Sequence, residues 1–322
     1  MLHKILVIGG SGFIGRHLIA QLVEQGHRIT VPTRKRDRAR HLWLHPKLDV
    51  IEADVHCPDT MARLVAGHTA VINLVGVLHS KPGSPYGPDF AKNHVDLVRK
   101  IVGAMQQAGV GAENARLLHM SALGASAQGS SMYSRSKAAG EALVRDSGLA
   151  WTIFQPSVVF GPEDQFLNTF AKLAKIAPVF PLAGSGARLQ PVYVQDVAQA
   201  FVTALDDRAT IGQTYQLAGP RVYTLAELVR FAAAVGAHRN IPVLPLPLGI
   251  GKLQALAMEL APGPTLMSRD NVDSLKADNV ATDDGLARLG IHAQAMEPIA
   301  TLYLQGKHPR TRSDGWRVRA HR

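Results

Sequence analysis

Tyr133 and Lys137 are the side chains whose types and spacing could do chemistry. They stand four residues apart in Tyr133-Ser-Arg-Ser-Lys137, within a helix predicted to begin at Met132, so both side chains lie on one face. A free phenol, with a pKa of about 10, is a poor acid or base at neutral pH, but a neighbouring ammonium stabilises the phenolate. We therefore expect Lys137 to lower the pKa of Tyr133. The phenol could then give a proton to a carbonyl or take one from an alcohol.

A serine hydroxyl could complete this pair by hydrogen-bonding the reacting oxygen. Ser121 directly follows a strand predicted over Ala115–Met120 and precedes Tyr133 by twelve residues. Three other serines compete for the role: Ser126, Ser130 and Ser131. A Y-x-x-x-K pair by itself is a common accident of surface residues, so the surrounding elements must decide its meaning.

A glycine-rich turn near the start of the chain indicates a dinucleotide-binding site. The apolar run Ile5–Ile8 predicts a buried parallel strand, and Gly9, Gly12 and Gly15 follow it, opening a helix predicted over Phe13–Gln25. In such a turn the first glycine permits the bend, the second lets the backbone approach a pyrophosphate, and the third lets the helix pack closely. The phosphates would meet free N–H groups at the start of the helix.

Strands and helices alternate after this turn. Further strands are predicted at His27–Val31, Leu48–Glu52, Ala70–Leu74, Ala115–Met120, Ala150–Gln155 and Thr214–Leu217, and further helices at Phe90–Ala108 and Met132–Asp146. This alternation indicates right-handed crossovers and an α/β fold with a doubly wound parallel Rossmann sheet.

Prolines and glycines loosen the pattern beyond Pro156. We expect an NADP(H)-binding domain of residues 1–160 and 189–220, a smaller discontinuous substrate or partner lobe of residues 161–188 and 221–304, and a flexible basic tail of residues 305–322. An apolar helix at Ile250–Leu260 is expected to pack in the core of the lobe. Docking on a membrane or a partner is the alternative for this helix.

The residues after the second strand favour NADP(H) over NAD(H). A cofactor with a free ribose usually meets an Asp or Glu there, whereas this chain has Val31-Pro-Thr-Arg34 and no acid before Asp37. The guanidinium of Arg34 could bind a 2′-phosphate through its fork of donors, with Lys35, Arg36 and Arg38 as helpers. A solvated basic loop is the alternative.

Other cofactor contacts are predicted from their places at strand ends. Asp54 could accept a hydrogen bond from the adenine amino group, or it could be an ordinary turn or N-cap acid. Gly76 leaves room where a larger side chain would block the cofactor. Lys137 would hold the nicotinamide ribose, and a positive nicotinamide would help to lower the pKa of Tyr133. The predicted cofactor-binding residues are Gly9, Gly12, Phe13, Ile14, Gly15, Arg34, Asp54, Val55, Leu74, Gly76, Asn93, Tyr133, Lys137, Pro156, Ser157 and Val158.

Composition narrows the class of protein. A chain of 322 residues with 46% hydrophobic and 19% charged residues can bury a large core. The single cysteine, Cys57, excludes an internal disulfide and a multi-cysteine metal site; we expect no metal and a reducing compartment. No signal segment and no uncharged run long enough to span a bilayer is present, so we expect a cytoplasmic protein, peripheral at most to the inner face of a membrane.

The net charge of +10 is concentrated in two short segments, residues 34–40 and 307–322. Neither accompanies a nucleic-acid-binding motif, so we expect no nucleic-acid partner. A solvated basic tail is the ordinary interpretation of the second segment, and contact with anionic lipid or an acidic partner is its alternative.

These motifs together resemble the extended and atypical branches of the short-chain dehydrogenase/reductase superfamily, whose members use Ser, Tyr and Lys. Residues 155–162 are similar to its R-P-x-x-x-x-G-P strand end, with Gln155 in place of Arg, and residues 191–198 resemble its P-x-x-V-x-D-V-A segment. Asn93 matches a backbone-bonding or water-relay asparagine of the family. Residues 161–168, 183–196 and 275–280 look like the subgroup of the Rossmann-type NADPH-binding accessory subunit of respiratory complex I and its bacterial homologues.

The resemblance implies an NADP(H)-binding oxidoreductase that acts on a carbonyl or alcohol of a small or lipid-like substrate through Tyr133, Lys137 and Ser121. One alternative is a nucleoside-diphosphate-sugar epimerase or dehydratase, in which Arg188, Arg221 and Arg269 would bind a second pyrophosphate. The other is a non-catalytic, cofactor-stabilised subunit with a respiratory or membrane partner. A homodimer through the helices beside the fourth and fifth strands rests on analogy alone.

Overall fold

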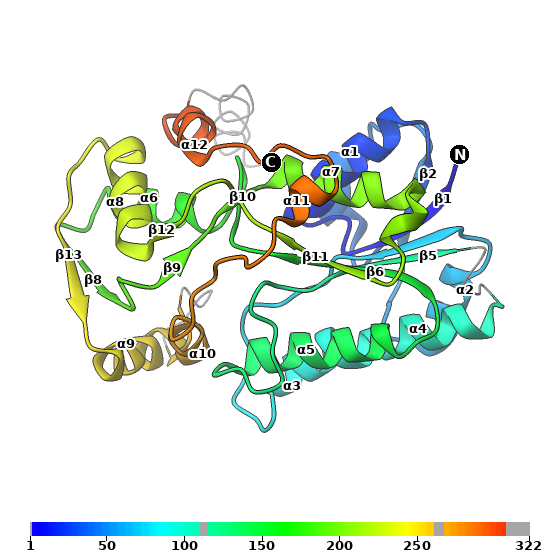
Figure 1. The fold of residues 1–322 in the computed structure, drawn as a ribbon, viewed down its shortest axis with the longest axis horizontal. Helices are drawn as coiled ribbons and strands as arrows, with labels where there is room; N and C mark the ends of the chain where they lie inside the picture. Colours follow the sequence, from blue (N-terminus) through cyan, green and yellow to red (C-terminus); the bar gives the residue numbers. More distant parts are fainter. Residues whose placement is uncertain (1, 110–114, 261–266, 307–322) are drawn as a thin grey trace. The chain divides into compact units, whose positions relative to one another are not determined.

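The computed structural model describes residues 2–109, 115–260 and 267–306, and the chain divides into two compact units (Figure 1). The first unit comprises Met1–Pro156, Gln195–Leu217 and Ala281–His292. The second comprises Ser157–Val194, Ala218–Val280 and Ala293–Arg322. Each unit is therefore assembled from three separate segments of the chain.

The first unit contains a seven-stranded parallel sheet of order β11-β6-β5-β4-β1-β2-β3. Its strands are β1 (Lys4–Ile8), β2 (Arg28–Thr33), β3 (Leu48–Glu52), β4 (Ala70–Asn73), β5 (Arg116–Met120), β6 (Ala150–Pro156) and β11 (Gln213–Leu217). The strand order reverses between β1 and β4, and the carboxyl ends of these two strands form the switch point at which such sheets bind ligands. The predicted doubly wound Rossmann sheet is confirmed.

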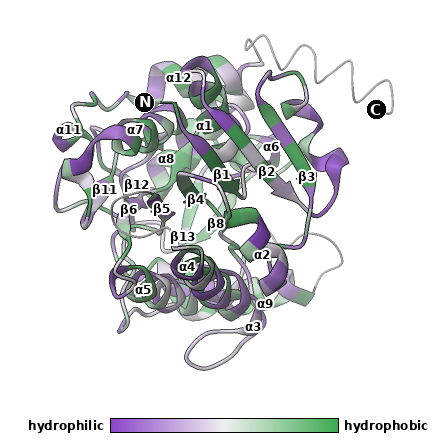
Figure 2. Ribbon diagram, turned by 90° about the vertical axis from the view of Figure 1, so that its right-hand side faces the viewer, coloured by the Kyte–Doolittle hydropathy of each residue, from purple (hydrophilic) through white to green (hydrophobic). Residues whose placement is uncertain are grey.

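Helices cover both faces of the sheet (Figure 1). One face carries α1 (Phe13–Glu24) and α7 (Val194–Asp206), and the other carries α2 (Pro58–Val65), α4 (Leu97–Gln107) and α5 (Met132–Arg145). The shorter elements are α3 (Pro88–Phe90), α11 (Gly285–Arg288) and the 3₁₀ turns η1 (Arg36–Leu42) and η3 (Arg208–Thr210). The hydrophobic colours of Figure 2 concentrate on the inner strands, where Leu6, Val71 and Leu117 are buried against α4. The core therefore holds β1, β4 and β5 rigidly, and these strands lead to the predicted site.

One predicted helix is interrupted. The sequence predicts a continuous helix over Phe90–Ala108, but α3 and α4 are separated by a π-helical segment, η2 (Ala91–Asp96). A π-helical turn is wider than an α-helical one and shifts the direction of the side chains after it. Helix α5 approaches η2 so closely that a Cβ on Gly140 would overlap the carbonyl oxygen of His94. Such local widening leaves no periodic signal in the sequence, so the prediction of one regular helix is wrong.

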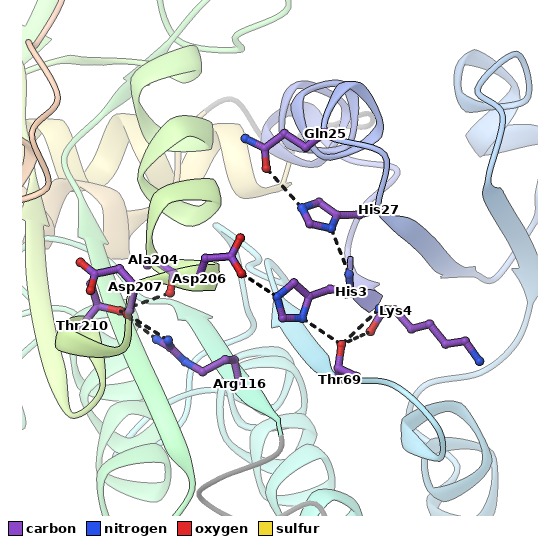
Figure 3. A network of polar contacts seen from close by, with 10 residues as sticks. All are labelled: His3, Lys4, Gln25, His27, Thr69, Arg116, Ala204, Asp206, Asp207 and Thr210. Carbon is purple, nitrogen blue, oxygen red and sulfur yellow. Dashed lines mark hydrogen bonds and ion pairs between the residues drawn. The ribbon is translucent and has the colours of Figure 1, made fainter. Parts of the chain in front are cut away.

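A polar network lies at the amino-terminal ends of the strands of the sheet (Figure 3). The imidazole of His3 lies 2.9 Å from Oδ1 of Asp206 in α7 and 3.0 Å from Oγ1 of Thr69, the residue before β4. Arg116, which begins β5, donates to Oγ1 of Thr210 at 2.8 Å. These contacts fasten α7 and the turn after it to the ends of the strands opposite the switch point.

The described part of the second unit contains three two-stranded sheets and five helices. The pairs β10-β7, β12-β9 and β13-β8 are formed by β7 (Val159–Phe160), β8 (Phe180–Ala183), β9 (Arg188–Leu189), β10 (Val192–Tyr193), β12 (Tyr223–Thr224) and β13 (Val243–Leu246). The helices are α6 (Leu167–Leu173), α8 (Leu225–Gly236), α9 (Leu248–Leu260), α10 (Arg269–Ser274) and α12 (Met296–Leu304). Side chains of α6, α8 and α12 form the core of this unit, in which Leu228 and Ala300 are fully buried.

Helix α9 does not pack as expected. Gly251 and Ala255 are its buried residues, and they pack near Ala183 and Val272. Leu253 is 68% exposed and Leu260 is 78% exposed. The expectation that this helix belongs to the core is therefore wrong for its outer face. None of the helices in the described ranges has the length and apolar character needed to cross a lipid bilayer.

Candidate nucleotide-binding and catalytic site

The glycine turn joins β1 to α1 at the switch point. Gly9 has a φ of +84°, a left-handed conformation that favours glycine, and a Cβ there would lie 3.2 Å from the backbone nitrogen of Val75. Gly12 is the N-cap of α1 and has no side chain with which to cap it. A Cβ on Gly15 would overlap the carbonyl oxygen of Gly10. The turn is thus closely packed, and the start of α1 is left to bind an anion through its N–H groups.

A cavity of about 170 Å³ lies beside this turn. Gly9, Arg34, Arg38, His56 and Asn93 are among the residues that line it. None of the described lining residues is acidic, whereas two are arginines. The cavity therefore suits an anionic group at the end of β2, where the sequence predicts the adenosine ribose.

Asp54 and Asn93 have local partners near this cavity. Oδ1 of Asp54 accepts a hydrogen bond from the backbone nitrogen of His56 at 2.9 Å, as a turn acid does. Asn93 donates from Nδ2 to the carbonyl of Asp89 at 2.8 Å, within the interrupted helix. Burial, followed by the positive charge of Lys92, lowers the pKa of His56. The adenine contact of Asp54 stays a prediction, as do the cofactor contacts of Phe13, Ile14, Val55 and Leu74.

Helix α5 brings Tyr133 and Lys137 together near the end of β5. Nζ of Lys137 donates to the carbonyl of Met120 at 3.2 Å and lies 6.0 Å from the centre of the Tyr133 ring. The rings of Phe90 and His94 meet the Tyr133 ring edge to face, with centroids 5.9 and 5.5 Å away. The predicted pair therefore shares one enclosed face of the helix.

The pKa of Tyr133 departs from the expectation. Burial raises it to about 12, so the prediction that Lys137 lowers it is wrong for the described residues on their own. Burial also lowers the pKa of Lys137 to about 8, against the opposing negative charge of Glu141. A phenol with a raised pKa keeps its proton at neutral pH, so Tyr133 is in the form that can donate, as a weaker acid than a free phenol.

The candidate serines differ in what their hydroxyls do. Ser131 caps α5, since its Oγ accepts from the nitrogen of Ser134 at 3.1 Å. Oγ of Ser126 accepts from the nitrogen of Gln128 at 3.3 Å. Ser121 is 3% exposed, and its buried Oγ has no hydrogen-bond partner among the described residues. A buried hydroxyl in that condition calls for a partner, and a substrate oxygen would supply one.

His94 links the end of β4 to α5 and was not predicted from the sequence. Its Nε2 accepts from the backbone nitrogen of Val77 at 3.0 Å, so its proton is on Nδ1, which lies 2.8 Å from Oγ of Ser136. That hydroxyl donates in turn to the carbonyl of Tyr133 at 2.8 Å. Burial, followed by the charge of Lys137, lowers the pKa of His94 to about 2. The one signal in the sequence is a histidine directly after Asn93 in an otherwise apolar helix face.

A second buried histidine, His119 in β5, also escaped prediction. Its Nδ1 lies 3.2 Å from Nδ2 of Asn73 at the end of β4, and burial lowers its pKa to about 3. Both histidines are therefore neutral supports beneath the site.

Gln155 stands where the family pattern has an arginine, and Arg145 supplies a positive charge nearby. Its Nε2 donates to Oε1 of Glu141 at 2.7 Å, and Arg145 donates to the other carboxylate oxygen at 2.6 Å. The side chain of Glu141 is 3% exposed. Arg145 thus neutralises a buried carboxylate one helical turn from Lys137.

The remaining predicted residues lie at the end of β6 and directly after it. Pro156 ends the strand, and its carbonyl accepts from the nitrogen of Leu123 at 2.9 Å. Ser157 and Val158 belong to the second unit, in which Oγ of Ser157 is 2.5 Å from Oδ1 of Asn279. Their cofactor contacts stay predictions.

The three arginines suggested for a second pyrophosphate are all ion-paired in the second unit. Arg188 pairs with Asp278 at 2.8 Å, Arg221 with Glu297 at 3.1 Å and Arg269 with Glu259 at 2.9 Å. These pairs weaken the interpretation as a sugar-nucleotide enzyme.

The fold and the glycine turn define a dinucleotide-binding protein of the Rossmann type. The chain belongs to the NAD-dependent epimerase/dehydratase family, whose model matches residues 5–218. This is an NAD(P)-binding family of extended short-chain dehydrogenases/reductases, as the sequence motifs predict.

Known relatives agree with this assignment. The chain is 33% identical over 299 residues to the Mus musculus protein named NADH dehydrogenase (ubiquinone) 1 alpha subcomplex subunit 9, mitochondrial, over 90% of this chain and 77% of the relative. It is 30% identical over 246 residues to a ceramide reductase of Caulobacter vibrioides, over 76% of this chain and 74% of that protein. The NADPH-dependent quinone oxidoreductase QOR2 of Escherichia coli has the same fold, with a TM-score of 0.73 at 18% identity, over 93% of this chain and 99% of the other.

Proposed function

We propose that this chain is an NADP(H)-dependent oxidoreductase that reduces a carbonyl of an apolar, lipid-like substrate, or oxidises the corresponding alcohol. One observation carries the proposal. Lys137 donates to the carbonyl of Met120, the residue before Ser121, and so the Tyr133–Lys137 pair lies beside a buried hydroxyl that lacks a partner among the described residues.

Each side chain has a distinct role in this proposal. Tyr133 gives its phenolic proton to the carbonyl oxygen, and Ser121 donates a second hydrogen bond to the same oxygen. Lys137 would hold the ribose of the cofactor, and in the loaded protein the positive charges of Lys137 and the nicotinamide would oppose the effect of burial on Tyr133. The reduced nicotinamide, when bound, supplies the hydride. His94 and Ser136 orient the backbone of Tyr133.

The choice of NADP(H) over NAD(H) rests on the cavity after β2. It presents Arg34 and Arg38 and no described acidic residue, so a 2′-phosphate would find cations and a free ribose would find no carboxylate. Arg34→Ala should weaken NADPH at least tenfold and leave NADH nearly unchanged, as measured by titration calorimetry. Arg28→Ala, at an exposed arginine that begins β2 and does not line the cavity, is the matched control. Equal losses for the two nucleotides would remove Arg34 from this role.

The lipid-like substrate is supported by the relative named ceramide reductase and by the paired state of Arg188, Arg221 and Arg269. The reaction is tested by following NADPH oxidation with long-chain ketones and with nucleoside-diphosphate sugars. Tyr133→Phe should lower kcat with the ketones at least 100-fold, whereas Tyr215→Phe in β11 should not. Equal rates for wild type and Tyr133→Phe would exclude the phenol as the proton donor. Turnover of the sugar nucleotides alone would favour the epimerase or dehydratase alternative.

A second candidate function is that of a cofactor-stabilised subunit. It is favoured by the similarity, over 90% of this chain, to a subunit of NADH dehydrogenase. In that role the nucleotide would stay bound and unoxidised. Its removal would lower the Tm strongly, and no turnover of NADPH would be seen with any substrate tested. A cytoplasmic location facing a membrane or respiratory partner is compatible with either role.

A further inference from the structure

The outer face of α9 is an apolar stripe. Ile250, Leu253, Ala257 and Leu260, here called the α9 stripe, are all exposed. Their spacing of three, four and three residues places them on one side of the helix, at about 100° per residue. Gly251 and Ala255, which are buried, lie on the opposite side. The stripe therefore faces away from the core of its own unit.

The charged residues of α9 flank the stripe and do not interrupt it. Lys252 pairs with Asp273 at 2.8 Å, and Glu259 pairs with Arg269 at 2.9 Å. Both residues project to the same flank, towards α10, by helical geometry. In the segment before the helix, Leu244 in β13 is 49% exposed and Pro247 is exposed.

The size of the stripe argues against a second copy of the chain as its occupant. A helix of this length presents a strip of ~20 Å by ~10 Å, about 200 Å², whereas a stable protein pair buries about 800 Å² on each partner. A bilayer surface needs no complementary shape. It accepts a helix that lies in its plane with an uncharged apolar side and a polar flank, which is the arrangement of α9.

We propose that α9 is an interfacial membrane-docking helix, with the α9 stripe inserted among the head groups and upper acyl chains of a lipid bilayer. The ion-paired flank adds little net charge, so the stripe contributes through burial of apolar surface. The formal net charge of +10, which residues 34–40 and 307–322 mainly carry, predicts stronger binding of the whole chain to an anionic membrane than to a neutral one. This proposal is independent of the proposed reaction, because binding is measured without substrate.

The test is flotation of the full chain with vesicles of phosphatidylcholine and phosphatidylglycerol. Leu253→Glu should lower the partition coefficient at least fivefold. Leu302→Glu in α12 is the matched control, since Leu302 is also an exposed leucine, at 56%, and the variant changes the net charge equally. Helices α9 and α12 lie at opposite ends of the second unit (Figure 1), so the control leaves the stripe intact. It should bind within twofold of wild type.

A direct readout comes from Leu253→Trp and Leu302→Trp. The emission of the tryptophan at 253 should shift to the blue on addition of vesicles and be quenched by brominated acyl chains, whereas that at 302 should not respond. Equal binding of Leu253→Glu and wild type, or equal losses in both glutamate variants, would overturn the proposal. So would a wild-type dimer in sedimentation equilibrium that Leu253→Glu dissociates, which would assign the stripe to a second copy. Unchanged melting curves and nucleotide content exclude misfolding as the cause of any loss.

Discussion

Gly76 stands against the ammonium of Lys137: a Cβ on this glycine would lie 3.4 Å from Nζ of the lysine and 4.0 Å from Nε2 of His94. The backbone after β4 and the outer end of a catalytic candidate therefore approach each other with room for a methyl group and little more. Gly76 does not have a positive φ, so the backbone would accept another residue. Only the space beside Lys137 limits the size of a side chain at this position.

This contact predicts a graded response to size at position 76. Gly76→Ala should bind the nucleotide within about threefold of wild type, because the added methyl group makes an ordinary van der Waals contact. Gly76→Leu should weaken binding at least tenfold, since its side chain must displace Lys137 or occupy the cofactor space. The measurement is NADPH titration, with Tm as a check on folding. Equal affinities of the leucine and alanine variants would show that the space beside Lys137 is not used.

The two buried histidines predict a loss of stability in mild acid. Both imidazoles have an ordinary pKa of 6.5, and burial lowers it to about 2 in His94 and about 3 in His119. Below pH 6.5 the unfolded chain binds protons at these positions while the folded chain does not. The free energy of unfolding should therefore fall as the pH drops from 6.5 towards 4, by up to about 1.4 kcal/mol per pH unit for each histidine.

His119→Gln isolates one of these contributions. The free energy of unfolding of each protein is measured in urea at pH 7.5, 6 and 5. It should depend less steeply on pH in the variant than in wild type, by up to about 1.4 kcal/mol per pH unit. Carboxylates that titrate in the same interval are common to both proteins and cancel in the comparison. Parallel slopes would mean that His119 takes up a proton in the folded state.

The buried carboxylate of Glu141 predicts that stability lost with Arg145 can be restored by a new arginine at position 155. Arg145→Ala should destabilise the protein by about 1–2 kcal/mol, because the carboxylate keeps Gln155 as a donor but loses its neighbouring guanidinium, which is itself partly exposed and screened. Adding Gln155→Arg to this variant should recover at least half of the loss in urea unfolding. No recovery in the double variant would show that a guanidinium at position 155 cannot reach Glu141.

The sheet could be predicted from the sequence because its strands are continuous apolar runs. β3 has the predicted bounds, Leu48–Glu52, and the other strands of the sheet differ by one or two residues. The Tyr133–Lys137 pair could be placed because its spacing fits a helical face. Hydrophobic periodicity reports a regular helix with one buried face, and both of these features satisfy that condition or its strand equivalent.

The residues that hold the catalytic side chains in place could not be predicted, because they depend on contacts between distant segments. Nothing near Glu141 in the sequence indicates that Gln155 will donate to it, and the π-helical segment that places His94 has no compositional sign. The predicted direction of the pKa shift of Tyr133 was wrong for the same reason. The spacing to Lys137 is visible in the sequence, but burial of the phenol is not. Helix α9 shows the converse: its leucines are apolar, yet several of them face outward.

The sheet gains its last strand late in synthesis. β11 pairs with β6, but roughly 56 residues lie between Pro156 and Gln213, so at 5–20 residues per second the ribosome needs about 3–11 s to deliver the neighbour of β6. During that interval the nascent chain exposes an unpaired strand edge that carries Phe154 and Gln155, a template for aggregation. Chaperones that shield extended apolar segments would have their greatest effect on this protein in those seconds, and slower translation of the segment between β6 and β11 would lengthen its exposure.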